Sequence, residues 1–132
     1  MKKHLLYYYI DLIIVHFKKI SKMEQLNFSK NWNNKLDCQA FTTIRLPNPK
    51  YQVGRLFDIT LLEETKGVGK ITAIRYLDIE DIDEYIARLD TGCSVDACKT
   101  IIRNIYPHAD FKQQQLALLL IVKEEGVQNR PT

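Results

Sequence analysis

The alternation of hydrophobic and polar positions predicts three β-strands in the first part of the chain. Residues 40–46 and 70–77 are rich in β-branched and aromatic side chains, and residues 56–62 alternate between apolar and polar positions. Both patterns are typical of strands. Pro47 ends the first strand. The segment 63–69 contains two glycines, and we expect it to form the hairpin connection between the other two strands.

Two consecutive helices are predicted after these strands. Apolar residues recur at three- and four-residue spacing over residues 79–89 and again over residues 95–105, as on the buried stripe of an amphipathic helix. Between them, Gly92 is placed to end the first helix with a left-handed residue. Ser94 is placed to cap the start of the second helix.

A continuous apolar run over residues 116–122 predicts a last strand that is buried on both faces. We also expect a short helix over residues 30–36. The order of strands, a helical pair and one more strand differs from alternating βαβ units. It predicts an α+β fold, in which a small mixed or antiparallel sheet curls into a barrel, with two consecutive helices before the last core strand.

Length and composition are those of one globular domain. The chain has 132 residues, of which 45% are hydrophobic and 27% charged. We expect residues 23–132 to form this domain and residues 1–22 to be an N-terminal extension, to which no role is assigned. In the extension, Asp11 and His16 interrupt an apolar run between basic ends. This argues against a signal peptide and a membrane span, while a membrane-surface segment stays open as an alternative.

Charge and cysteine content narrow the classes of protein further. The formal net charge of +3 permits binding to nucleic acid without demanding it. Cys38, Cys93 and Cys98 form no CxxC pair, and the histidines are scattered, so neither a disulfide framework nor a zinc site is expected. No motif indicates a cofactor. We therefore expect a cytoplasmic protein with reduced thiols and with neither metal nor cofactor.

The strand at residues 40–46 carries the first candidate chemistry. Because side chains alternate across a sheet, Phe41, Thr43 and Arg45 share one face, and the opposite face suits the core. An Arg guanidinium can bind phosphate bidentately, and an aromatic ring can stack on a base. By periodicity alone, an ordinary exposed strand face explains the same residues more simply.

Five segments in this order resemble the ASCH family, a branch of the PUA-like barrels. They cover about residues 24–123 and read FTTIR (41–45), YQVGRLFDI (51–59), GKITAIRYLDIEDI (69–82), LDTGCSVDACKTIIRNIYP (89–107) and LALLLIV (116–122). The resemblance implies a PUA-like barrel that binds RNA or modified nucleosides in a cleft. Small bacterial members hydrolyse the acetyl amide of N4-acetylcytidine, and this chain is similar to them in its TTIR strand and TIIRNIYP helix end.

That hydrolysis uses a Lys, a Thr and a Glu. The resemblance assigns the Thr to Thr43, and the nearest match for the Glu, just before the second helix, is Asp90. The family's Lys is replaced by Ala40. A Thr hydroxyl is a weak nucleophile unless a base takes its proton, which an alanine cannot do. Lys35, in the preceding segment, is the candidate substitute base.

Two functional hypotheses follow. In the first, the domain is a noncatalytic module that binds RNA or a nucleotide. Phosphate then contacts Arg45, Lys50 and Arg55, and a base lies near Phe41 and Thr43. In the second, the chain is an amidohydrolase acting on acylated nucleosides. Thr43 is then the nucleophile, Asp90 the acid/base partner and Lys35 the base. A weaker third hypothesis is a structural or partner-binding domain.

Overall fold

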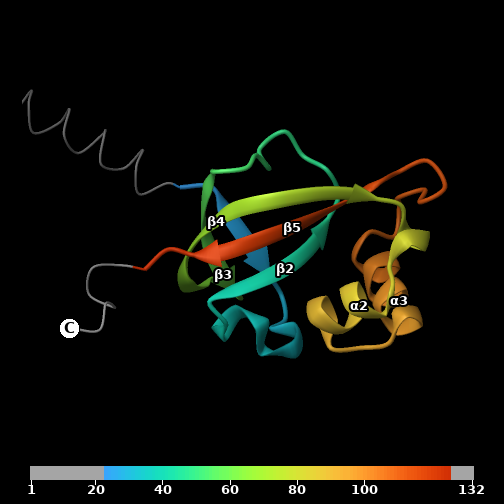
Figure 1. Cartoon of the computed structure of the whole chain (residues 1–132), viewed down its shortest axis with the longest axis horizontal. Coiled ribbons are helices and arrows are strands. Elements are labelled where there is room, and N and C mark those ends of the chain that lie inside the picture. The colour runs from blue at the N-terminus through green and yellow to red at the C-terminus, as the bar shows by residue number, and fades with distance from the viewer. Residues whose placement is uncertain (1–22, 126–132) are drawn as a thin grey trace, which may run out of the picture.

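The fold is seen in a computed structural model that describes residues 23–125. The expected N-terminal extension, residues 1–22, lies outside the described residues. Figure 1 shows a strongly curved sheet with the last two helices of the chain together at one end. In chain order the elements are β1 (Gln25–Phe28), the 3-10 helix η1 (Trp32–Asp37), β2 (Ala40–Arg45), β3 (Leu56–Leu61), β4 (Glu64–Leu77), the 3-10 helix η2 (Ile79–Asp81), α2 (Glu84–Thr91), α3 (Val95–Ile105) and β5 (Leu116–Lys123).

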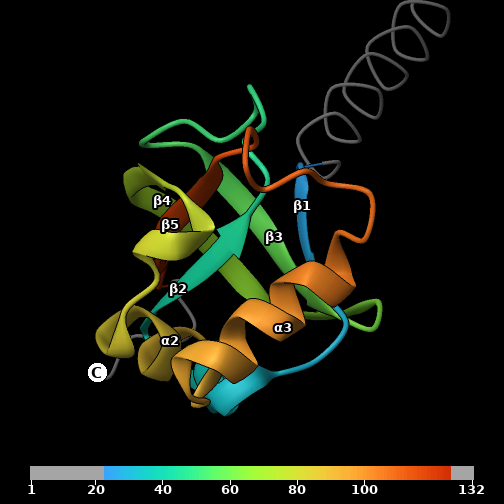
Figure 2. The same ribbon diagram turned by 90° about the vertical axis from the view of Figure 1, so that its right-hand side faces the viewer.

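The sheet is mixed and curls into a half-barrel. Its strand order is β1-β3-β4-β5-β2. β1 runs parallel to β3, and the other neighbouring strands are antiparallel. Register irregularities between Ile59 and Thr60 and between Ile71 and Ala73 interrupt the ladders, and such bulges bend strands. The strand order makes β1 and β2 the two edges of the sheet. Figure 2 shows α3 on the side of the molecule where both edges lie.

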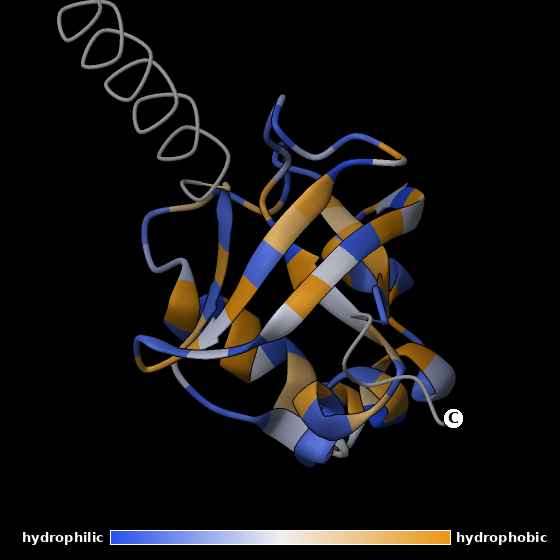
Figure 3. Cartoon of the chain, turned by 90° about the vertical axis from the view of Figure 1, so that its left-hand side faces the viewer, coloured by the Kyte–Doolittle hydropathy of each residue, from blue (hydrophilic) through white to orange (hydrophobic). Residues whose placement is uncertain are grey.

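Hydrophobic residues are buried on both faces of this sheet, and the hydrophobic positions along the strands can be followed in Figure 3. β5 shows how one strand serves both faces, because Leu119 and Ile121 belong to one cluster while Leu116 and Leu118 belong to the other. The first cluster includes Leu26, Leu36, Phe41, Tyr51, Phe57, Ile59 and Ile71. The second packs the opposite face against the helices and includes Ile44, Leu77, Ile79, Ile82, Ala87, Cys98 and Ile102. The expectation that residues 116–122 are buried on both faces is confirmed for most of the run.

The predicted α+β class, the mixed curled sheet and the helical pair before the last strand are confirmed. Gly92 ends α2 in the left-handed conformation, with φ of 75°. Ser94 caps α3 by accepting a hydrogen bond from the Ala97 N–H. The short helix expected at residues 30–36 exists as η1. No helix among residues 23–125 is both long and apolar enough to cross a membrane.

Two expectations about the elements are wrong, and one strand was not predicted. The long hairpin connection at residues 63–69 is instead mostly strand, because the chain reverses within two residues, Leu62 and Glu63, that both have positive φ. The first helix begins later than predicted, since a capping box at Asp78 and an N-cap at Asp83 divide the segment into η2 and α2. β1 was not predicted from the sequence.

Candidate functional site

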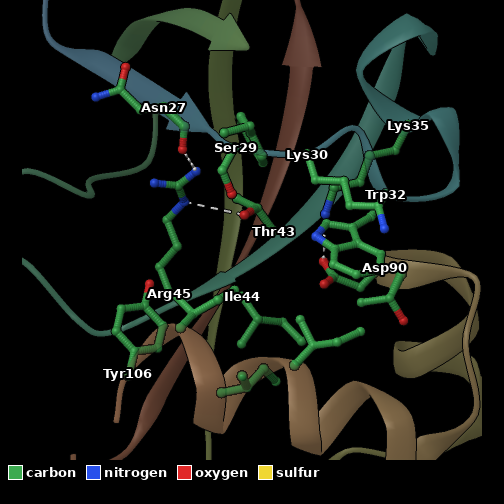
Figure 4. Close-up of a pocket in the computed structure, with 15 residues that line it drawn as sticks. Asn27, Ser29, Lys30, Trp32, Lys35, Thr43, Ile44, Arg45, Asp90 and Tyr106 are labelled. Carbon is green, nitrogen blue, oxygen red and sulfur yellow. Dashed lines mark hydrogen bonds and ion pairs between the residues drawn. The ribbon is translucent and has the colours of Figure 1, made fainter. Parts of the chain in front are cut away.

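Four residues selected from the sequence line one pocket. They are Lys35, Thr43, Arg45 and Asp90, and Figure 4 shows them converging from different elements. The pocket has a volume of about 160 Å³. It lies between the segment from β1 into η1, the end of β2, the last turn of α2 and the apolar side of α3.

Lys35 and Asp90 form a buried ion pair beside this pocket. Lys35 Nζ lies 3.1 Å from Asp90 Oδ1, and Thr42 Oγ1 donates a hydrogen bond of 3.1 Å to the same oxygen. Burial lowers the pKa of Lys35, and Asp90 opposes this shift. Burial raises the pKa of Asp90, and Lys35 opposes that shift in turn. The pair is thus brought closer to its neutral forms than two solvated side chains would be.

Two asparagines before Lys35 explain how it reaches the interior. Asn33 and Asn34 have positive φ values of 57° and 53°, a conformation that Asn tolerates better than most residues. They turn the chain so that Lys35 and Leu36 are buried. Asn33 Nδ2 also donates to the carbonyl of Arg88 at 3.3 Å, which joins η1 to α2. The local backbone therefore delivers the ammonium group to Asp90.

Arg45 is held at the other end of the pocket by contacts on several sides. Its Nε donates to Thr43 Oγ1 at 3.2 Å, and its Nη2 donates to the carbonyl of Asn27 at 2.7 Å. Its guanidinium carbon lies 4.6 Å from the centre of the Phe28 ring. Because Asn27 is in β1 and Arg45 ends β2, this side chain spans the two edges of the half-barrel.

Thr43 contributes a hydroxyl that is almost completely buried. Its side-chain oxygen accepts the hydrogen bond from Arg45, so its own proton stays available to an acceptor in the pocket. Asp90 and Lys35 line the same pocket from α2 and η1. The structure thus brings together the three residues that the amidohydrolase hypothesis names.

Phe41 requires a correction. Its ring is only 5% exposed and packs edge-to-face against Phe28 at a centroid distance of 6.0 Å. The face of β2 that carries Phe41 contributes to a hydrophobic cluster. Because both faces of the sheet are covered, this ring cannot stack on a base at the surface.

Lys50 and Arg55 lie in the loop between β2 and β3 and do not line the pocket with Arg45. Lys50 Nζ is 3.9 Å from Glu24 Oε2, and Arg55 Nη1 donates to the carbonyl of Lys50 at 3.2 Å. The expected basic surface is therefore divided between two places. Only Arg45 among the three belongs to the pocket.

Several residues that line the pocket were not predicted from the sequence. Trp32, Lys30, Asn27 and Tyr106 all border the pocket, and Lys30 Nζ lies 4.1 Å from the centre of the Trp32 ring. Burial raises the pKa of Tyr106, while Arg45 opposes the shift. The sequence feature that could have indicated these residues is Trp32, the only tryptophan of the chain, which occurs within a polar segment. In the structure its side chain is half-buried.

The lining carries more positive than negative charge, since three cationic side chains accompany the carboxylate of Asp90. Among residues 23–125, no group of three or more His, Cys, Asp and Glu side chains is placed to hold a metal ion. The cysteines in this range are free, and burial raises the pKa of the Cys98 thiol.

No protein-family model, no curated protein and no solved structure matches the chain.

Proposed function

We propose that this chain is a PUA-like module of the ASCH type and that its pocket binds RNA or a nucleotide. The curled mixed sheet with a helical pair before its last strand is compatible with such a barrel. The segment FTTIR, one of the five segments that together carry the resemblance, lies in the strand that contributes Thr43 and Arg45 to the pocket.

The observation that carries the proposal is the fixed position of Arg45. Hydrogen bonds to Thr43 and Asn27 and the contact with Phe28 hold the guanidinium in place before any ligand arrives. A guanidinium has more N–H donors than these two hydrogen bonds use. The remaining donors suit a phosphate or a base carbonyl, and little side-chain entropy is then lost on binding.

The test is calorimetric titration of the full chain with cytidine monophosphate and with a short single-stranded RNA. Arg45→Gln should weaken RNA binding and make the dependence of affinity on salt shallower by about one unit of logarithmic slope. Arg75→Gln is the matched control, because Arg75 is an exposed arginine of β4 that does not line this pocket. Equal losses in the two variants would contradict the proposal.

A second candidate function is hydrolysis of N4-acetylcytidine or a related acylated nucleoside. The observation in its favour is Lys35, which lies beside Asp90 in the pocket that Thr43 also lines. The family's Lys is replaced by Ala40, and Lys35 offers an amine from η1 in its place. Burial lowers the pKa of Lys35, which favours the neutral amine that a general base requires.

In this reaction a proton first passes from Lys35 to Asp90 within the ion pair. The Thr43 oxygen then attacks the acetyl carbon while the neutral Lys35 takes the hydroxyl proton. The amide C–N bond breaks, and the leaving amine of cytidine receives a proton from Asp90, whose raised pKa favours the protonated acid. These two proton transfers restore the ion pair of Lys35 and Asp90. Water then attacks the acetyl-threonine ester: its oxygen joins the acetyl group, one of its protons restores the Thr43 hydroxyl, and the other is released to solvent with the acetate.

This candidate is tested by chromatography of N4-acetylcytidine incubated with the full chain. Release of cytidine and acetate should be lost in Thr43→Ala and retained in Thr72→Ala, since Thr72 is an exposed threonine of β4. Turnover that survives Thr43→Ala would remove Thr43 from the mechanism. Absence of turnover in the unmodified chain would leave the binding function as the proposal.

A further inference from the structure

Trp32 stands at the pocket without any role in the functions proposed above. It borders the same cavity as Lys35, Asp90 and Arg45, and Figure 4 shows it at the end of the pocket near Asp90. Its side chain is half-buried rather than packed into either hydrophobic cluster. An indole that borders a cavity in this way is available to a flat ligand.

The size of the cavity limits what can enter it. Its volume of about 160 Å³ is smaller than the roughly 300–1,000 Å³ of pockets that enclose a whole small molecule. A single ring system can enter, and the rest of the ligand must stay outside. A paired base cannot enter, because its ring is already stacked and bonded within a duplex.

The chemistry of the walls suits a base with an anionic backbone. Apolar side chains of α3, Ile101 and Ile105, line the pocket together with Trp32. Cationic groups lie at two places, Arg45 at one end and Lys30 above the Trp32 ring. The phosphates attached to a base inside the pocket would therefore lie near these two positive charges.

We propose that the pocket receives one unpaired base against Trp32, with the attached phosphates at Arg45 and Lys30. This inference rests on the proposed binding function and makes it specific. The ligand class is single-stranded nucleic acid or a free nucleotide, and duplex RNA is excluded. Trp32 takes the stacking role that the sequence had assigned to Phe41.

The experiment uses the full chain and the fact that Trp32 is its only tryptophan. Emission excited at wavelengths that the seven tyrosines do not absorb therefore reports on this ring alone. A short cytidine-rich RNA is titrated as a single strand and, separately, after annealing to its complement. Calorimetry on the same samples gives the affinity independently of the fluorophore. We expect the single strand to change the emission and to bind at least 10-fold more tightly than the duplex.

Variants separate stacking from general binding. Trp32→Leu should weaken single-strand binding between about 5- and 150-fold, the range for loss of one base–aromatic stack. Trp32→Phe should restore most of the affinity. Tyr85→Leu is the matched control, because Tyr85 is an exposed aromatic residue of α2 that lies outside this pocket, and its affinity should not change.

The outcomes distinguish this inference from the function on which it rests. Calorimetric binding that is equal in Trp32→Leu and in the unmodified chain would overturn the role of Trp32 and leave the binding function intact. Duplex RNA that binds as tightly as the single strand would overturn the exclusion of paired bases. No heat of binding with either RNA or with cytidine monophosphate would overturn the binding function, and the inference with it.

Discussion

Lys35 and Asp90 are 55 residues apart in the chain, yet Lys35 Nζ lies 3.1 Å from Asp90 Oδ1, and both residues are almost completely buried. The contact joins η1 to the last turn of α2. Burying two charges costs desolvation free energy that an exposed ion pair largely avoids. The buried pair is tolerated because Lys35 and Thr42 both donate hydrogen bonds to the Asp90 carboxylate. Each partner therefore depends on the other.

Removing one partner should be worse than removing both. Asp90→Asn leaves the Lys35 ammonium buried without its counter-charge, and we expect a loss of about 3 kcal/mol in the free energy of unfolding. The double variant Lys35→Met/Asp90→Asn removes the buried charge and should lose less than Asp90→Asn alone. Urea denaturation measures both values. A double variant that is less stable than Asp90→Asn would contradict the coupling of the two charges.

The stability of the Asp90→Asn variant should increase with pH. Burial depresses the pKa of Lys35 below its ordinary value of 10.5, and Asp90, which opposes this shift, is absent from the variant. Between the folded pKa and 10.5 the unfolded chain binds a proton that the folded chain releases, so stability rises with pH in that window. Urea titrations from about pH 7 to pH 10 measure this slope. The double variant lacks the lysine and should show no such rise.

The turn between β3 and β4 should accept a stabilising pair of substitutions. Leu62 and Glu63 have φ values of 48° and 72°, which are unfavourable for residues other than Gly, Asn and Asp. Leu62→Asn/Glu63→Gly should raise the unfolding free energy by about 1 kcal/mol and the Tm by several degrees. Calorimetry gives both. The control Val53→Asn, at another exposed apolar residue without positive φ, should bring no such gain.

Gly69 should tolerate no side chain. A Cβ at this position would lie 2.5 Å from Ile121 Cγ2 and 2.8 Å from Ile59 Cδ1, inside the packed core. We expect Gly69→Ala to lower the unfolding free energy by about 2 kcal/mol, within the range for overpacking. Adding Ile59→Val removes one of the two clashing atoms, so the combined loss should be smaller than the sum of the separate losses. An unchanged Tm in Gly69→Ala would refute this reading of the core.

Strong local patterns explain why much of the fold could be predicted. β2, β3, β5 and α3 lie close to the segments that alternation or helical period indicates. The β3–β4 turn was missed because Leu62 and Glu63 are not turn formers, and the connection was assigned to the glycines that follow. β1 was missed because a four-residue strand, paired in parallel with β3, carries too short a pattern to be distinguished.

The candidate site was harder to predict. Alternation correctly grouped Phe41, Thr43 and Arg45 on one face of β2, but it could not show that this face turns into the core at Phe41 and toward the pocket at Arg45. The position of Lys35 depends on the two asparagines with positive φ before it. Trp32 lies directly before these two asparagines and borders the pocket. The hydrophobic residues of this segment show no strand or helix period from which its position could have been predicted.

The place of β5 in the sheet has a consequence for the timing of folding. β5 lies between β4 and β2, yet it is the last of the described strands along the chain. Until the ribosome has released residues up to Lys123, β2 has no strand partner and the β3–β4 hairpin has an open edge. A nascent chain that stalls before this point exposes two unpaired strand edges, which are sites where chains aggregate. Chaperone dependence should therefore be greatest late in synthesis rather than early.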